Sequence, residues 1–406
     1  MAERHRRRRL ALALAAAAAL WAPAGAQAAG RPDVSAPAAI VVDARDGHVL
    51  YRSAPADERP IASATKLMTA LVALEELPLD RKLRAVPYDP APAESRIDLR
   101  TGERMSVADL LRALLLESAN DAAETLAVRS AGSVTAFVSR MNERAEQLGL
   151  RHTRFANPIG LDAPGAHSSA GDLARVAREV LRSDFLAATV DMPRARLLSG
   201  SRARIVTNRN RLVRETPWVN GVKTGHTGQA GYVLVGSGTR RGATVVSVVL
   251  GAPSEPARDA DTLSLLRFGL GRYRRVRPVR AGATLATAAV EYFGGREVDL
   301  VPARPLGTTV RRGQRLRTEV RAPGELSGPL PAGARVGRVT VYLDGRRVRS
   351  TAVVTAAQVP GAGFARKAWY VVRGPLLVLA ALAAAAFLVM RRRRGLAGRR
   401  RPARAG

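Results

Sequence analysis

The 406-residue chain contains no cysteine. Disulfide bonds, thiolate nucleophiles and cysteine-bound zinc are therefore all excluded. Aromatic residues make up only 4% of the chain, which disfavours proteins that stack single-stranded nucleic acid on aromatic side chains. The five histidines have no metal-ligand spacing. We therefore expect no metal, no other cofactor and no nucleic-acid partner.

Lysine is scarce too. The 65 basic residues include only four lysines, Lys66, Lys82, Lys223 and Lys367. Arginine serves equally well in surface charge and ion pairs, but it does not lose its proton in a protein, whereas a buried lysine can become neutral and act as a base. Lys66 is therefore a candidate for proton transfer, with chance retention as the alternative. Lys82 and Lys367 are interpreted as solvated charges.

The formal net charge of +31 is partly concentrated in arginine-rich stretches at the two ends of the chain. The remaining positive charge is spread over the body without a run of interleaved arginine and aromatic residues. A basic exterior of this kind suits an anionic envelope polymer or a lipid surface at least as well as nucleic acid.

Residues 1–28 have the pattern of an export signal. A basic start is followed by a short apolar stretch and by the small-residue pattern Ala26-Gln27-Ala28. The apolar stretch is too short to support the prediction of a membrane-spanning helix. We therefore predict a signal peptide that is cleaved after Ala28.

The other end of the chain predicts a membrane anchor. Residues 374–390 carry no charge, and Trp369 and Tyr370 before them are typical interfacial anchors. Four arginines follow at once, so a transmembrane helix over residues 369–390 would leave a basic tail, residues 391–406, in the cytoplasm. The body would then lie outside the cell on a single-pass protein of the cell membrane. A buried core helix, or an anchor lying on the membrane, is the alternative.

Between these ends the hydrophobic pattern changes once. In residues 33–273, β-rich runs at both ends bracket a long middle part of helical periodicity, which predicts an α+β domain. Residues 276–357 show short alternating segments with glycine and proline turns, which predict a small all-β domain. Residues 359–368 are expected to be the linker to the membrane.

Three short motifs follow one another in the first domain. They are Ser63-x-x-Lys66, Ser118-x-Asn120 and Lys223-Thr224-Gly225. If the first motif opens a helix, Ser63 and Lys66 lie on one face, and their side-chain ends can meet. A serine beside a desolvated lysine is an activated nucleophile that needs no histidine.

These motifs, in this order, are the signature of the penicillin-recognising serine acyltransferases. With the flanks "RPIASATKLMTA", "SANDAA", "HTRFANPIGLDAPGAHSSAGDLA" and "VNGVKTGHTGQAGYVLVGSG", the chain resembles the low-molecular-mass penicillin-binding D-alanyl-D-alanine carboxypeptidases over residues 33–272. The resemblance implies a β-lactamase/transpeptidase-like catalytic domain, an antiparallel sheet with helices, followed by the β domain and the membrane attachment. It also implies peptidoglycan stem peptides as substrates and β-lactam antibiotics as covalent inhibitors.

The resemblance assigns the catalytic steps as well. Ser63 would attack the carbonyl between the last two D-alanines, and Lys66 would take its proton. Ser118 and Asn120 would line the opposite side of the cleft, relay a proton to the leaving amine and orient the acyl chain. Backbone N–H groups of Ser63 and His226 would form the oxyanion hole.

Substrate binding is assigned to the third motif. Lys223 would supply positive potential, and Thr224 would bind the terminal carboxylate of the substrate. Gly225 would let the strand backbone approach the substrate. Arg209 is a further partner for the carboxylate, although arginine is so abundant here that its presence carries little information.

Other interpretations remain open. Asn157 and His167 are interpreted as residues that structure their loop. A class A β-lactamase is disfavoured because no Glu-x-x-x-Asn pattern lies between Asn120 and Lys223. A D,D-endopeptidase acting on peptidoglycan cross-links would use the same residues. A non-catalytic, membrane-tethered module that binds the cell wall is the alternative from another functional class.

Overall fold

The computed structural model describes residues 30–397. The predicted signal peptide and the last part of the basic tail, residues 398–406, lie outside the described residues. The chain forms two compact units, the first ending at Tyr273 and the second beginning at Arg274. Each unit is described by itself below.

The first unit is built on a five-stranded antiparallel sheet. Its spatial order is β2-β1-β9-β8-β7, so the first strand of the unit pairs with one of the last. The register joins Ala38 to Leu250 and Asp43 to Val245. The strands are β1 (Ala38–Asp43), β2 (Val49–Ser53), β7 (Val219–Thr227), β8 (Gly231–Arg240) and β9 (Ala243–Ala252).

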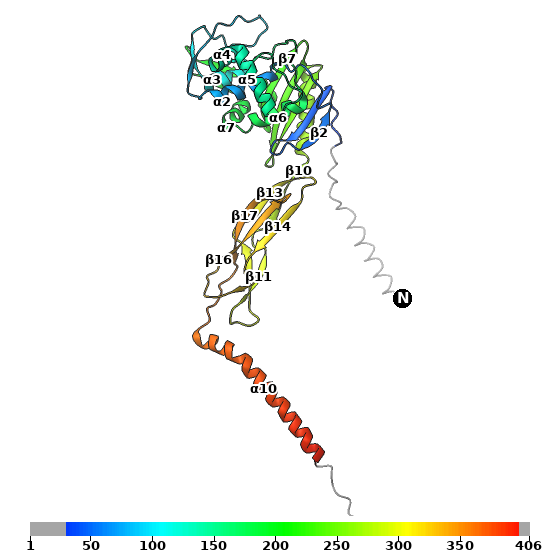
Figure 1. The fold of residues 1–406 in the computed structure, drawn as a ribbon, viewed down its shortest axis with the longest axis vertical. Coiled ribbons are helices and arrows are strands. Elements are labelled where there is room, and N and C mark those ends of the chain that lie inside the picture. The colour runs from blue at the N-terminus through cyan, green and yellow to red at the C-terminus, as the bar shows by residue number, and fades with distance from the viewer. Residues whose placement is uncertain (1–29, 398–406) are drawn as a thin grey trace, which may run out of the picture. The chain divides into compact units, whose positions relative to one another are not determined.

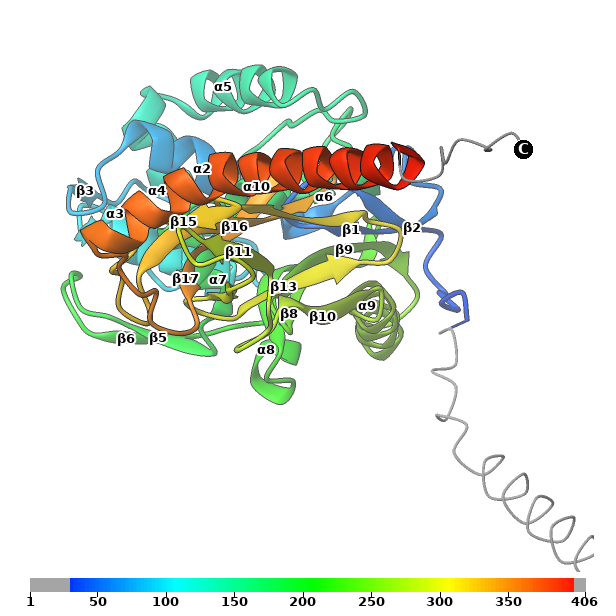
Figure 2. The same ribbon diagram turned by 90° about the horizontal axis from the view of Figure 1, so that it is seen from below.

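Both faces of this sheet are covered. Ile40 and Val42 pack into the large core beneath the helical middle part of the unit, while Ala39 and Val41 pack on the opposite face. Helix α9 (Glu255–Leu270) covers that opposite face, and Figure 2 shows α9 and α6 on opposite sides of β1 and β9. The unit has further helices: those labelled α2 to α7 in Figure 1 contribute to the large core, whereas α8 contributes to the core on the α9 face. They are α2 (Lys66–Glu76), α3 (Val107–Arg112), α4 (Asn120–Ala131), α5 (Val134–Gln147), α6 (Ala170–Val180), α7 (Asp184–Asp191) and the short α8 (Leu212–Glu215).

Two small hairpins complete the first unit. Strand β3 (Lys82–Arg84) pairs with β4 (Arg104–Ser106), and β5 (Arg194–Leu197) pairs with β6 (Arg204–Thr207). The long segment that joins β3 to β4 returns to the N-terminus of α4, where the N–H of Asn120 donates to the carbonyl of Ser95 (2.8 Å). This segment therefore lies beside the second motif.

The second unit is all-β up to its last helix. It contains a six-stranded sheet of order β14-β16-β17-β12-β11-β15 and a separate pair, β10 and β13, and both contribute buried aliphatic side chains to one core. The strands are β10 (Tyr273–Val279), β11 (Ala286–Val290), β12 (Glu297–Pro302), β13 (Leu306–Arg311), β14 (Leu316–Arg321), β15 (Glu325–Leu326), β16 (Arg335–Leu343) and β17 (Arg346–Thr355). The predicted fold class, an α+β unit followed by an all-β unit and an apolar helix, is confirmed.

The last helix, α10 (Phe364–Ala397), is the only one in the described part of the chain that is long and apolar enough to cross a membrane. Within its segment Phe364–Arg392, the most apolar 18-residue window has a mean hydropathy of 2.2 and contains no buried residues. The helix begins at Phe364, so it includes half of the segment expected to be a linker. Gly and Pro residues lie only in the first part of the expected linker, before Phe364. The second part, "FARKA", contains no helix-breaking residue, so the helix can begin there.

Candidate active site

Ser63 and Lys66 are in direct contact. Ser63 lies in a 3₁₀ turn, η2 (Ala62–Thr65), and Lys66 is the first residue of α2. The Nζ of Lys66 is 2.9 Å from the Oγ of Ser63. The lysine side chain is wholly buried, and burial together with the positive charges of Lys223 and Arg209 holds the pKa of Lys66 well below its usual value, against an opposing contribution from Glu94. A neutral amine beside a serine hydroxyl can accept its proton.

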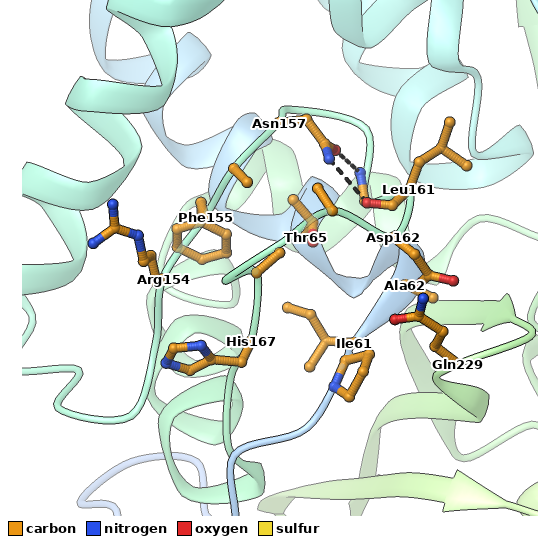
Figure 3. Close-up of a pocket in the computed structure, with 15 residues that line it drawn as sticks. Ile61, Ala62, Thr65, Arg154, Phe155, Asn157, Leu161, Asp162, His167 and Gln229 are labelled. Atoms are coloured by element: carbon orange, nitrogen blue, oxygen red, sulfur yellow. Dashed lines mark hydrogen bonds between the residues drawn. The ribbon is translucent and has the colours of Figure 1, made fainter.

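A loop covers the other side of Lys66. The Nζ of Lys66 also donates to the carbonyl of Ile159, and the hydroxyl of Thr69 donates to the carbonyl of Pro158 (2.7 Å). The Asn157 side chain holds this loop together: Nδ2 donates to the carbonyl of Leu161 (2.9 Å), while Oδ1 accepts from backbone N–H groups of the same loop (Figure 3). These contacts support the interpretation of Asn157 as a residue that structures its loop.

The same loop packs tightly on η2, the turn that carries Ser63. Gly160 has a φ of +81°, and a Cβ placed on it would lie 2.2 Å from the carbonyl oxygen of Ala62. Beside this contact lies a small cavity of about 20 Å³, lined by Ile61, Ala62 and Thr65 together with loop residues (Figure 3). His167 lines the same cavity, and its Nε2 lies 3.5 Å from a carboxylate oxygen of Glu58, so its contacts are made away from Ser63.

The second motif lies at a break between helices. A single π-helical turn, η3 (Ala113–Glu117), ends at Ser118, which has a left-handed backbone conformation with a φ of +66°. Asn120 then begins α4. Its Nδ2 donates to the carboxylate of Glu94 at 2.7 Å. The left-handed residue turns the chain sharply. Ser118 and Asn120 are both buried, but only Ser118 lines the groove described below.

The third motif lies on the edge strand β7. Lys223 is buried, and its Nζ donates to the carbonyl of Thr224 (3.0 Å). Burial, with the nearby charges of Arg209 and Arg258, lowers the pKa of Lys223 to about 7. The positive charge expected of this lysine is therefore only partly present at neutral pH.

Gly225 brings β7 against η2. A Cβ at this position would lie 3.0 Å from both the backbone nitrogen of Ser63 and the Cβ of Ala62. Glycine therefore permits the close approach of two backbones. The ring of the following His226 stacks on that of Tyr232, with centroids 4.2 Å apart.

The motifs meet at one groove of about 490 Å³. Of the predicted site residues, Ser63, Ser118, Arg209, Thr224, Gly225 and His226 line it. The other three, Lys66, Asn120 and Lys223, are buried. The structure thus brings together residues from the three motifs, which are far apart in the sequence.

Arg209 has a partner that was not expected. Its Nη2 lies 2.8 Å from Oε1 of Glu117, and its side chain is about half exposed (51%). A substrate carboxylate at Arg209 would therefore share the guanidinium with Glu117. Other groove residues were not predicted from the sequence, among them Ser95, Arg214, Tyr232, Glu255 and Arg258. Glu117 could have been suspected because it adjoins Ser118, and Tyr232 because it lies in the flank of the third motif, but the others lie outside the motifs and their quoted flanks.

Comparison with known proteins gives consistent results for both units. Residues 25–254 match the family model described as D-alanyl-D-alanine carboxypeptidase, and residues 273–361 match that of the penicillin-binding protein 5 C-terminal domain. The D-alanyl-D-alanine carboxypeptidase DacC of Escherichia coli is 32% identical over 373 residues, covering 86% of this chain and 91% of DacC. DacF of Bacillus subtilis is 29% identical over 338 residues, covering 81% of this chain and 87% of DacF.

Solved structures give the same result. Penicillin binding protein 5 from Haemophilus influenzae aligns with a TM-score of 0.56 and 28% identity, covering 82% of this chain and 99% of that protein. The DD-transpeptidase of Streptomyces K15 aligns with a TM-score of 0.56 and 31% identity, covering 59% of this chain and 98% of that protein. The first similarity extends over both units, whereas the second covers a smaller share of the chain.

Proposed function

The chain belongs to the family of D-alanyl-D-alanine carboxypeptidases, and we propose that it removes the terminal D-alanine of peptidoglycan stem pentapeptides through an acyl-enzyme on Ser63. The contact between the Lys66 amine and the Ser63 hydroxyl carries this proposal. It places a base with a lowered pKa within hydrogen-bond reach of a nucleophile that lines an open groove.

Acylation begins with proton transfer. Lys66 accepts the proton of Ser63 as Oγ bonds to the carbonyl carbon of the penultimate D-alanine. The negative charge that develops on the carbonyl oxygen is stabilised by the backbone N–H groups of Ser63 and His226, a contribution of about 3 to 4 kcal/mol for one such donor in related chemistry. The closeness of β7 to the nucleophile turn at Gly225 supports this pairing of donors.

The leaving group is then protonated. Ser118 relays a proton to the amine of the departing D-alanine, and Asn120 orients the acyl chain. Thr224 binds the terminal carboxylate, with Arg209 and the protonated form of Lys223 supplying positive charge. Water hydrolyses the ester on Ser63, so the net reaction releases D-alanine and restores the free serine.

We place the first unit outside the cell membrane, with α10 as a single-pass anchor. The apolar character of residues 364–392 and the arginines at their end support this topology. Penicillin and other β-lactams would acylate the same serine as inhibitors.

The experiment uses the full-length chain in detergent with a synthetic stem pentapeptide. We expect release of free D-alanine, measured by a stereospecific amino-acid assay, and covalent attachment of labelled penicillin to the peptide that contains Ser63. The Ser63→Ala variant is the control and should lose both. Labelling that persists in this variant would reject Ser63 as the nucleophile. Cleavage of a cross-linked dimer, but not of the pentapeptide, would favour the D,D-endopeptidase.

A further inference from the structure

A carboxylate outside the three motifs lies beside the second one. Glu94, in the segment between β3 and β4, accepts hydrogen bonds from Nδ2 of Asn120 (2.7 Å) and from the hydroxyl of Tyr88, both at Oε2. Its Oε1 accepts from the N–H of Ala91 (3.0 Å). Three donors thus hold the side chain in place, one of them from the proposed catalytic machinery.

The segment that carries Glu94 is fixed to α4 by further bonds. The carboxylate of Asp121 accepts from the N–H groups of Ile97 (3.2 Å) and Leu99 (3.0 Å). The N–H of Asn120 donates to the carbonyl of Ser95 (2.8 Å). These hydrogen bonds join the segment that carries Glu94 to the start of α4, which carries Asn120. Glu94 therefore contacts Asn120 in a defined geometry.

This contact determines how the Asn120 amide is oriented. An ionised carboxylate only accepts hydrogen bonds, so the amide atom that faces Glu94 must be the nitrogen. The carbonyl oxygen Oδ1 and the second proton of Nδ2 are then left for other partners. A flipped amide would exchange donor and acceptor at the place where the acyl chain is to be oriented.

Glu94 also places negative charge near a cluster of cations. Its charge opposes the effects of burial, Lys223 and Arg209 on the pKa of Lys66, and Lys66 in turn helps to lower the pKa of Glu94. Burial acts to raise the pKa of Glu94, but the hydrogen bonds from Tyr88 and Asn120 outweigh it, so the pKa is lowered. Glu94 is therefore ionised at neutral pH.

We propose that Glu94 is a positioning residue of the carboxypeptidase site: its carboxylate fixes the orientation of the Asn120 amide and holds a negative charge near the Lys66 amine. This inference rests on the proposed function. The two effects can be separated, because glutamine keeps an acceptor for Asn120 but lacks the charge, whereas alanine removes both.

The experiment measures the rate constant for acylation by fluorescent penicillin between pH 5 and 9, with the full-length chain in detergent. In Glu94→Gln the protonated form of Lys66 loses a stabilising charge, so the acidic limb of the profile should move to lower pH. Glu94→Ala should show the same movement and also a loss of acylation efficiency at the optimum, on the order of tenfold, because a charge-assisted hydrogen bond is lost.

The matched control is Glu76→Gln. Glu76 ends α2, the helix that Lys66 begins, and its ion pair with Arg140 is partly exposed. This variant removes the same charge from the other end of that helix and should leave the pH profile unchanged.

Two results would overturn the inference. An acidic limb that stays in place in both Glu94 variants would show that the carboxylate does not act on Lys66, even if Glu94→Ala lowers the melting temperature. Equal efficiency of Glu94→Ala and the parent at the optimum would show that Asn120 needs no such partner. If the parent itself is not acylated at Ser63, the proposed function fails first and the inference fails with it.

Discussion

The two lysines of the motifs are both buried, but they differ in what their nitrogen atoms contact. The Nζ of Lys66 lies 2.9 Å from the Ser63 hydroxyl, whereas Nζ of Lys223 donates to the carbonyl of Thr224. A proton acceptor must be able to lose its own proton, and arginine cannot do so. A residue that supplies only positive charge has no such requirement.

Arginine substitution should therefore separate the two roles. Lys66→Arg should lower the rate of acylation by penicillin by about a hundred- to ten-thousand-fold, the usual contribution of a general base. Lys223→Arg should lose less, because its charge is kept and only the geometry changes. Stopped-flow acylation rates and melting temperatures of both variants give the comparison. Small and equal losses of acylation rate in the two variants would contradict the proton-transfer role of Lys66.

The pKa of Lys223, lowered to about 7, predicts a pH dependence of substrate binding. Below pH 7 the amine is protonated and attracts the terminal carboxylate; as pH rises through 7 this charge is lost. We expect kcat/KM for an acid-terminated peptide, relative to its C-terminal amide, to fall over this range. Using the ratio cancels the opposite effect of Lys66, which must be deprotonated to act. In Lys223→Arg the ratio should stay level, and a level ratio in the parent would contradict the assignment.

At the scale of elements, the site depends on two close approaches to the nucleophile turn η2. The loop around Gly160 approaches from one side and β7 approaches at Gly225. Neither position has room for a Cβ without displacement of neighbouring atoms. The turn that carries Ser63 is thus held between two backbones.

Gly225→Ala tests the approach of β7. The added methyl group would press on the backbone nitrogen of Ser63, a proposed oxyanion donor, and we expect acylation to fall by about ten- to a hundred-fold through misplacement of this donor. Gly228→Ala is the matched control, because no atom lies within 4 Å of a Cβ built there. The rate of acylation by penicillin is measured for both variants and for the parent. An unchanged acylation rate in Gly225→Ala would show that β7 can move away from η2 without misplacing the backbone nitrogen of Ser63.

Regular elements could be predicted from the sequence more completely than the turns between them. The β-rich runs of β1, β8 and β9 and the helical middle part are confirmed, since each pattern repeats along its own segment. The left-handed Ser118 could not be predicted, because a positive φ at a non-glycine residue is imposed by its surroundings. Glu94 was missed for a similar reason: 26 residues separate it from Asn120, and only the folded segment between β3 and β4 brings them together.

At the scale of the whole molecule, the catalytic unit and the apolar helix are separate parts of the chain. All predicted site residues lie in the first unit, which ends at Tyr273, whereas α10 begins at Phe364. None of the proposed chemistry requires α10. The proposed role of α10 is therefore that of an anchor, separate from the proposed chemistry.

A chain that ends after Gly363 should be soluble and should keep the acylation rate of the full-length protein, since it lacks only the apolar helix and the basic tail and retains every predicted site residue. Sedimentation with membranes and labelling with penicillin measure the two properties. The full-length chain, which should pellet with membranes, is the control. If the shortened chain also pellets, another surface of the protein binds the membrane.

The order of strands in the first sheet has a consequence for biogenesis. Strand β1 emerges among the first residues of the described chain, yet its partner β9 is the last strand of the first sheet. Between them the chain must pass through all the helices of the middle part, and the third motif arrives only with β7. Contacts so distant in sequence form slowly. A nascent chain that stops before β9 would contain Ser63, but the edge of β1 that pairs with β9 would be unpaired. Such a chain would be prone to aggregation and proteolysis. We therefore expect the first unit to fold only after all of its residues through β9 are available.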